Sequence, residues 1–430
     1  MVSLRVLVVG GGGREHALAW RLLRDPAVAE VLAAPGNPGI AAEARCVPLD
    51  ATDVRAVADL AERERVDLVV VGPEAPLVAG LADELRSREV PVFGPTKAGA
   101  RLEGSKAWAK ELCERSGIPT ARARTVASVA EGLEALDELG PPYVVKADGL
   151  AAGKGVVVTE DRGRAVRALE DCLVRGAFGQ AGATVLVEEH LAGREVSAFA
   201  LTDGRRVLPL GMAQDFKRAL DGDAGPNTGG MGAYSPVPFV DERAARRIWD
   251  GILARTAEAL AAEGVDYRGV LYAGLMLTAE GPRVLEFNCR FGDPEAQVLM
   301  PRVRSGLARA LLACAEGDLG PARVELDEGA CVTVVAASGG YPGPHETGLE
   351  IQGLAEAAAV PDAVVFHAGT ALRDGRVVTA GGRVLAVSGL GATIGRARAV
   401  AYEALSRIRF PSMHHRSDIA AAAAAEEGTS

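Results

Sequence analysis

The sequence predicts an α/β and α+β protein of several domains: an open parallel sheet, then a two-part central region, then a strand-rich C-terminal module. Three observations predict this. The first hundred or so residues alternate apolar runs with glycine turns and amphipathic helices. A glycine-rich segment lies between two β-branched runs near residue 150, and short alternating strands dominate the end of the chain. With 430 residues, 48% of them hydrophobic and 24% charged, the chain is long enough for about two to four domains.

The charge and the cysteine content exclude several classes of protein. The formal net charge is −10 and the isoelectric point is about 5.3, which argues against nucleic acid as the main partner. The 6 cysteines are scattered without a CxxC pair, as expected for reduced thiols in a cytoplasmic protein rather than for a disulfide framework or a zinc site. No apolar run reaches membrane length and no signal peptide is recognisable, so we expect no membrane partner.

The first domain, residues 1–103, is expected to be the open parallel sheet. Apolar runs at 4–9, 31–34, 66–71 and 91–93 have the character of buried strands, with helical segments between them. Ligands of such sheets bind beyond the carboxyl ends of the strands. Two loops lie at those ends, residues 10–15 and 72–74.

The first of these loops favours a phosphate or sugar-phosphate over a dinucleotide. Gly10 and Gly12 fit a dinucleotide fingerprint, but Glu15 stands where its third glycine belongs. A plain tight turn is the structural alternative. In the second loop, Glu74 is either an acceptor for a ribose hydroxyl or a solvated turn residue.

Residues 104–120 predict a helix that begins at the cap residue Ser105 and ends at Gly117. Lys106 falls in its first turn, where a cation opposes the helix dipole. This unfavourable position suggests that Lys106 binds a ligand.

Residues 141–159 predict two strands, 143–146 and 156–159, joined by a glycine-rich loop that carries Lys154. Small residues let backbone N–H groups close around an anion, and the lysines add positive charge, so a polyphosphate fits. A plain glycine hairpin explains the same pattern. Lysine stands at only six positions of the chain (97, 106, 110, 146, 154 and 217), which favours roles that need a compact, mobile ammonium.

Residues 211–236 are polar and glycine-rich, with little apolar periodicity, and are expected to form a long loop. Loops of this length in compact domains are usually functional or disordered. Asp215, Lys217 and Arg218 at its start suggest that it handles a substrate.

Residues 269–295 predict an antiparallel hairpin. In strict alternation, Glu286, Asn288 and Arg290 share one face of its second strand, opposite Leu285, Phe287 and Cys289. Carboxylate and amide oxygens suit Mg²⁺, and a guanidinium suits a phosphoryl group. A solvated face with a salt bridge is the alternative.

Taken together, a set of motifs along almost the whole chain resembles the phosphoribosylamine–glycine ligase family of the ATP-grasp superfamily. The motifs are GGGGREHALAW, GPEAPL, LEGSKAWAK, KADGLAAGKGV, QDFKR, GPNTGGMGAYSP, EFNCRFGDPE, GGYPG and FHAGT. The resemblance implies a substrate domain at 1–103, an ATP-grasp domain at 104–328 with a flap subdomain at about 121–190, and a C-terminal domain at 329–430. It also implies ATP-dependent joining of glycine to 5-phosphoribosylamine through a glycyl phosphate in purine biosynthesis, and a monomer.

The resemblance further implies roles for individual residues. ATP would be bound by Lys106, Lys146, Gly149, Gly153, Lys154, Gly155, Glu188, Glu189, Leu191 and Glu195, and Mg²⁺ or Mn²⁺ by Glu286 and Asn288. Phosphoribosylamine and glycine would contact Gly11, Gly12, Gly13, Arg14, Glu74, Arg218, Asn227, Gly229 and Gly230. Arg290, Lys217 and Asp215 would act in catalysis.

Three positions depart from the family pattern. Phe216 stands where the family has histidine, Ala273 and Gly274 stand where many ATP-grasp enzymes carry another metal carboxylate, and the terminal RxDIG pattern ends in Ala420. The rival interpretations are a carboxylating or formate-using ATP-grasp enzyme, an NAD-dependent dehydrogenase, and a nucleotide-binding regulator without catalytic activity.

Overall fold

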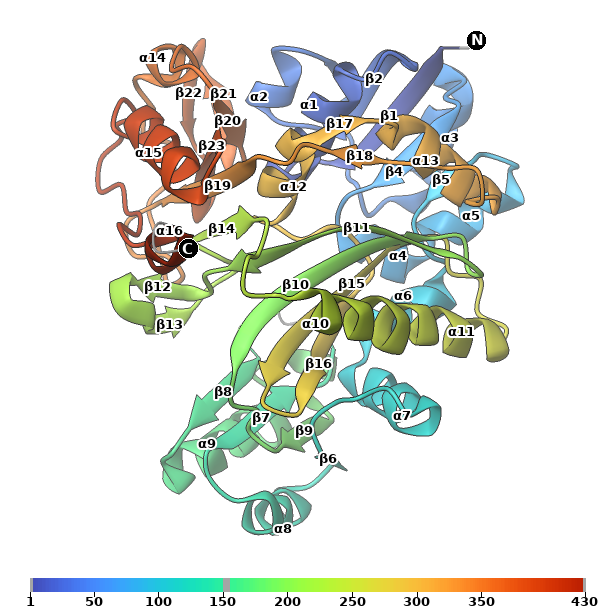
Figure 1. The fold of residues 1–430 in the computed structure, drawn as a ribbon, viewed down its shortest axis with the longest axis vertical. Helices are drawn as coiled ribbons and strands as arrows, with labels where there is room; N and C mark the ends of the chain where they lie inside the picture. Colours follow the sequence, from blue (N-terminus) through green and yellow to red (C-terminus); the bar gives the residue numbers. More distant parts are fainter. Residues whose placement is uncertain (1–2, 150–154, 428–430) are drawn as a thin grey trace.

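The computed structural model describes residues 3–149 and 155–427 and contains a parallel sheet, a small antiparallel sheet and a long antiparallel sheet (Figure 1). The predicted fold class is confirmed.

The N-terminal parallel sheet has the order β3-β2-β1-β4-β5. Val6 in the central strand is fully buried and pairs with Val31 on one side and Leu68 on the other. Apolar runs buried on both faces are what a parallel sheet requires. The strands are β1 (Leu4–Gly10), β2 (Val28–Pro35), β3 (Arg45–Cys46), β4 (Leu68–Val71) and β5 (Val92–Phe93), and the helices are α1 (Gly13–Leu23), α2 (Pro38–Ala41), α3 (Val54–Glu64), α4 (Glu74–Ala79), α5 (Leu81–Ser87) and α6 (Lys97–Gly104).

The flap subdomain is a small antiparallel sheet, in the order β6-β9-β7-β8, packed on two helices. It projects from the rest of the molecule at the bottom of Figure 1, next to α7. Its elements are β6 (Ala123–Val126), α8 (Val129–Leu139), β7 (Tyr143–Ala147), β8 (Val156–Thr159), α9 (Arg162–Leu173), η1 (Gly179–Gly182) and β9 (Val185–Glu188), and α7 (Lys106–Ser116) precedes them.

The long antiparallel sheet runs in the order β16-β15-β10-β11-β14-β19-β23-β20 and joins the central region to the C-terminal module. The junction is the pairing of β14 with β19, for example Gly232 with Val334. Its strands are β10 (Arg194–Thr202), β11 (Val207–Asp215), β14 (Gly232–Ser235), β15 (Gly269–Thr278), β16 (Gly281–Asn288), β19 (Ala330–Ala337), β20 (Ala363–His367) and β23 (Arg383–Gly391).

Helices and short hairpins complete the central and C-terminal regions. The helices are α10 (Glu242–Ile248), η3 (Trp249–Ala254), α11 (Arg255–Ala262), α12 (Ala296–Arg302), α13 (Leu307–Glu316), α14 (Leu354–Ala358), α15 (Ile394–Leu405) and α16 (Ala421–Glu427). The short elements are β12 (Arg218–Leu220), η2 (Asp221–Asp223), β13 (Ala224–Asn227), β17 (Val303–Ser305), β18 (Glu325–Leu326), β21 (Thr370–Arg373) and β22 (Arg376–Thr379).

Two predictions about local structure were wrong. Residues 211–236 are not a single loop, because β11 continues to Asp215 and the β12–β13 hairpin and β14 follow. The pairing of β14 between β11 and β19 supplies the order that the polar sequence does not suggest. In β16 strict alternation fails at Leu285, because the register with β15 shifts there and Val284, not Leu285, joins Phe287 in the core.

Candidate active site

The first charged cluster of the candidate site is a buried carboxylate shared by two lysines. The Glu188 carboxylate, at the end of β9, lies 2.7 Å from Lys146 Nζ and 2.9 Å from Lys110 Nζ. Lys146 Nζ also donates to Leu285 O at 3.1 Å. Burial raises the pKa of Glu188, but the two ammonium groups outweigh it and the pKa is lowered. Glu188 therefore holds two charged lysines in place. Lys110 had no role in the sequence-based assignment, although the scarcity of lysine could have marked it.

Lys106 lies where the first turn of α7 meets the glycine-rich segment. The cap predicted at Ser105 is confirmed, since Ser105 Oγ accepts from Trp108 N at 3.2 Å. Asp148 accepts from Ser105 Oγ and Ala107 N, and Lys106 Nζ donates to Gly149 O at 2.8 Å. Burial lowers the pKa of Lys106, and Glu286 opposes that shift. Of the loop residues predicted to bind ATP, Gly149 and Gly155 are described, while Gly153 and Lys154 lie outside the described residues.

Two of the residues that the family resemblance assigns to ATP, Glu189 and Leu191, directly follow β9. Glu189 N donates to Arg122 O at 2.9 Å, and its carboxylate pairs with Arg122 and Arg283. Leu191 is buried. The Glu188 side chain is engaged by the two lysines, so any contact of Glu188 with a base would have to come from its backbone.

The two candidate metal ligands stand on β16 opposite small or polar neighbours on β15. Glu286 pairs with Gly274 and Asn288 with Tyr272. A Cβ at Gly274 would lie 3.3 Å from Glu286 Cγ, so a larger residue there would crowd the carboxylate. Within the described residues, no hydrogen bond is made by the nearly buried amide of Asn288 or by the Glu286 carboxylate.

These donors fit Mg²⁺, which is a hard cation with oxygen ligands. The part of the chain described here has no group of three or more His, Cys, Asp or Glu side chains able to hold a metal by themselves. A cation on Glu286 and Asn288 would therefore complete its coordination with oxygens of a bound nucleotide and water, as Mg²⁺ does in nucleotide sites.

Arg290 is held at the end of β16 by two carboxylates from other elements. Its Nη2 lies 2.7 Å from Glu103 Oε1 in α6, and its Nε lies 3.2 Å from Glu74 Oε2. Burial raises the pKa of Glu74, but Arg290 and Arg14 outweigh it and the pKa is lowered. Glu103 also accepts from Cys289 N at 2.9 Å. Sequence reasoning missed Glu103, because a lone carboxylate in a helix carries no local signal.

The N-terminal glycine loop is closed by the side chain that broke the dinucleotide pattern. Glu15 Oε2 accepts from Gly12 N at 2.6 Å, and its Oε1 lies 2.6 Å from Arg14 Nε. A Cβ at Gly72 would lie 2.2 Å from Glu15 Oε1. Glu15 thus uses an amide and a space that a dinucleotide pyrophosphate would need. Arg14 N also donates to Asp293 Oδ2 at 3.3 Å, which brings this loop to the segment after β16.

A second charged cluster lies at the end of β11. Lys217 Nζ is 3.0 Å from Asp215 Oδ1 and also pairs with Glu195 on β10. Burial raises the pKa of Asp215 to about 7, with Lys217 opposing the shift and Glu295 adding to it. Glu295, unassigned from sequence, accepts from Tyr272 OH at 2.6 Å. The structure thus places Glu195 beside Asp215 and Lys217, the residues predicted to act in catalysis.

The remaining predicted substrate residues lie on or beside the β12–β13 hairpin. The backbones of Arg218 and Asn227 pair across it, and Arg218 Nη1 donates to Gly225 O at 2.7 Å. Gly229 N donates to Tyr341 OH at 3.0 Å, and Arg383 donates to Gly229 O and lies near Gly230. This segment therefore contacts both the central region and the C-terminal module.

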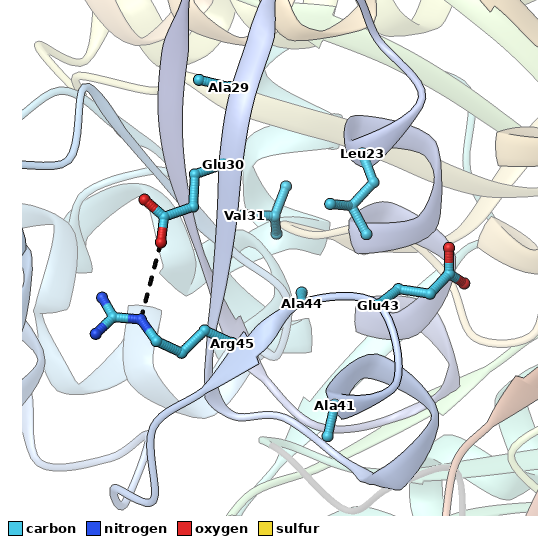
Figure 2. Close-up of a pocket in the computed structure, with 8 residues that line it drawn as sticks. All are labelled: Leu23, Ala29, Glu30, Val31, Ala41, Glu43, Ala44 and Arg45. Atoms are coloured by element: carbon cyan, nitrogen blue, oxygen red, sulfur yellow. Dashed lines mark ion pairs between the residues drawn. The ribbon is translucent and has the colours of Figure 1, made fainter.

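The described surface hollows of about 400 and 410 Å³ lie elsewhere, around β2, β3 and α2. Figure 2 shows the residues that line the first, among them Leu23, Val31 and the ion pair of Glu30 with Arg45. Neither hollow contains a residue of the site. The site is instead an arrangement of charged groups on β16, β9, α7 and β11.

Comparison with known proteins shows the family of the chain. The models of the phosphoribosylglycinamide synthetase N domain, ATP-grasp (A) domain and C domain match residues 4–103, 104–296 and 331–422. The chain belongs to the phosphoribosylglycinamide synthetase family. It is 50% identical to phosphoribosylamine–glycine ligase of Mesorhizobium japonicum (99% of this chain, 100% of the relative) and 52% identical to that of Leifsonia xyli subsp. xyli (98% and 100%).

Solved structures agree with this membership of the synthetase family. The crystal structure of phosphoribosylamine–glycine ligase from Thermotoga maritima superposes with a TM-score of 0.84 at 36% identity, covering 97% of this chain and 100% of that one. A biotin carboxylase domain from Hydrogenobacter thermophilus, solved with MgADP, has a TM-score of 0.72 at 17% identity over 96% of this chain and 92% of that one, which shows the shared fold alone. In residues 3–149 and 155–427 no helix combines the length and apolarity needed to cross a bilayer.

Proposed function

We propose that this protein catalyses the ATP-dependent joining of glycine to 5-phospho-D-ribosylamine, giving glycinamide ribonucleotide, ADP and phosphate in de novo purine biosynthesis. The observation that carries the proposal is membership of the phosphoribosylglycinamide synthetase family over almost the whole chain, at about half identity to enzymes of that name. ATP-grasp enzymes use ATP and Mg²⁺, and the cluster around Glu286 suits both.

Chemistry sets the order of events. A carboxylate is a poor electrophile, so the γ-phosphoryl group of ATP is first transferred to a glycine carboxylate oxygen, and ADP leaves. The amine of phosphoribosylamine then attacks the carbonyl carbon, phosphate departs with the C–O bond electrons, and the amine nitrogen loses a proton. Exclusion of water protects the glycyl phosphate between the two steps.

On this proposal, Lys106 and Lys146 neutralise the phosphates of ATP beneath the glycine-rich loop. Glu188 keeps Lys146 in a fixed position, since their ion pair is 2.7 Å long and both side chains are buried. Glu286 and Asn288 would hold Mg²⁺, which when bound offsets the charge that develops between the phosphates. Arg290, fixed by Glu103 and Glu74, is suited to stabilise the phosphoryl group in transfer.

The acceptor side is assigned from the two remaining clusters. Residues Gly11 to Arg14 and Glu74 would bind phosphoribosylamine, since this loop leads into the N-terminus of α1 and helix N-termini attract anionic groups. Asp215, Lys217 and the segment 225–232 would line the glycine side. Burial raises the pKa of Asp215 and Glu295 adds to that shift, which suits a carboxyl group that exchanges a proton with a substrate.

We also propose that Mn²⁺ replaces Mg²⁺, that the protein acts as a cytoplasmic monomer, and that it binds no nucleic acid. The oxygen ligands accept either ion, and the net charge of −10 opposes binding to nucleic acid. The domain boundaries expected at 103/104 and 328/329 belong to the same proposal.

The test measures ADP release with Mg²⁺-ATP and glycine, with and without phosphoribosylamine generated in situ. Release should require both substrates and should fall by about 10² or more in Glu286→Ala. Glu280→Ala is the matched control, because Glu280 is exposed in the turn of the same hairpin and pairs only at the surface with Arg283. Release supported by bicarbonate or formate in place of glycine, or an undiminished rate in Glu286→Ala, would refute the proposal.

A further inference from the structure

A segment near the C-terminus, residues 414–418, lies against the β12–β13 hairpin. We call these residues the strap. The strap and hairpin are almost 200 positions apart in sequence but are joined by several polar contacts. His414 Nε2 lies 2.7 Å from Ala219 O, Ser417 N donates to Asp221 Oδ1 at 2.8 Å, and Gly222 N donates to Asp418 Oδ2 at 2.8 Å.

Arg416 is the centre of the strap and is 1% exposed. Its Nε and Nη2 donate to the two oxygens of Asp418, each at 2.7 Å, and its Nη1 donates to Asp223 Oδ1 at 2.7 Å. A fully buried guanidinium needs carboxylate partners. The bond to Asp223 also links the strap to the hairpin.

Arg416 also contacts the residues on both sides of Lys217. Its Nη1 donates to Arg218 O at 3.1 Å, and its guanidinium carbon lies 5.1 Å from the centre of the Phe216 ring. Lys217 itself, whose carbonyl accepts from Thr228 N at 2.7 Å, starts the hairpin. The backbone that carries the Lys217 ammonium is therefore fixed from the side of the strap.

We infer that Arg416 is a positioning residue that holds Lys217 against Asp215 and Glu195 and thereby sets the affinity for glycine. The inference rests on the proposed function, in which this cluster lies at the glycine side. Phe216, which replaces the histidine of the family pattern, becomes a flat surface for the guanidinium. The RxD part of the terminal pattern thus has a role that the sequence alone left open.

Lysine at position 416 cannot make all the hydrogen bonds that the guanidinium makes. A guanidinium presents a planar fork that can meet Asp418 with two bonds while reaching Asp223 and a carbonyl, whereas an ammonium is a single point of charge. Arg416→Lys should keep the positive charge and lose some of the hydrogen bonds to Asp418 and Asp223. Arg416→Met should lose both.

The experiment measures KM for glycine, KM for ATP, kcat and melting temperature in the full-length protein. In Arg416→Met the KM for glycine should rise about tenfold or more with the KM for ATP within about twofold, and Arg416→Lys should fall between it and the wild type. If Arg416→Met does not fold, Asp223→Asn tests the same link, because Asp223 is 71% exposed and its loss leaves the Asp418 pair intact. It should raise the KM for glycine by about twofold to threefold.

Arg302→Met is the control for loss of a buried arginine. Arg302 donates to Ser235 Oγ and to the carbonyls of Gly329 and Asp327, away from the strap. It should lower the melting temperature without changing the KM for glycine. An unchanged KM for glycine in folded Arg416 variants, or an equal rise in both KM values, would overturn the inference. If the wild type shows no glycine-dependent ADP release, the proposed function itself fails.

Discussion

Glu188→Gln provides the sharpest test of how the proposed ATP site is held together. The wild-type carboxylate is 3% exposed and lies within 2.9 Å of Lys110 and Lys146, whose side chains are 7% and 9% exposed. The substitution keeps the shape of the side chain but removes the carboxylate that the two buried ammonium groups share. An amide has one acceptor oxygen, and its NH₂ group would face a cation.

The expected loss of stability follows from this burial. Breaking a buried ion pair by removing one partner costs about 3–5 kcal/mol, because the remaining charge is left uncompensated. For a chain of 430 residues that corresponds to a melting temperature about 3–6 °C lower. Mg²⁺-ATP should restore more stability to the variant than to the wild type, since the triphosphate would bring negative charge to Lys146.

Glu189→Gln is the matched control, one residue along the chain. Its carboxylate is 19% exposed and pairs with Arg122 and Arg283, which are 70% and 29% exposed, so its loss should cost less than about 1 kcal/mol. Differential scanning fluorimetry with and without Mg²⁺-ATP gives the comparison. Equal melting temperatures for the two variants would refute the claim that Glu188 acts as the shared counter-ion of both lysines.

Two further predictions concern the packing of the domains and the thiols. Burial lowers the pKa of His16 to about 3 and of His367 to about 4. Below about pH 6.5, the histidine pKa of an unfolded chain, the unfolded protein therefore binds more protons than the folded protein. The stability of the fold should fall as the pH drops below that value. At pH 5 each histidine should lower the free energy of unfolding by about 2 kcal/mol relative to pH 7 or above, which urea unfolding measures. His16→Asn should remove about half of this pH dependence. An unchanged pH dependence in that variant would contradict the assignment. Cys46 is partly exposed and the other cysteines are buried. A thiol reagent should therefore modify about one cysteine in the native protein and almost none in Cys46→Ser. Rapid reaction of several thiols would contradict the burial.

Sequence patterns predicted the structure correctly wherever an element depends on residues close to it in the chain. The strand–loop–helix order of the first domain, the cap at Ser105 and the β15–β16 hairpin depend on neighbouring residues, and all three are present. They failed where distant segments complete an element. β14 is ordered by β11 and β19, and the register shift at Leu285 is set by β15, so neither is visible in the periodicity of its own segment.

The same distinction applies to the site. Charged residues inside recognisable motifs, such as Lys106, Lys146, Glu286 and Arg290, could be selected from sequence because their types and spacing suit phosphate and metal chemistry. Their supporting partners could not. Glu103 and Arg290 are separated by 187 residues, and their contact exists only because α6 packs against the end of β16.

By itself, the sequence determined the class of fold and the family resemblance, and it selected the residues that we propose bind phosphate and Mg²⁺, because these depend on residue type and local spacing. Only the tertiary structure decided which charges neutralise one another. Glu188 serves two lysines, Glu15 closes the glycine loop and Arg416 fixes the backbone beside Lys217. A buried charge must find an opposite charge or a hydrogen-bond partner in three dimensions, and that partner can come from any distance along the chain.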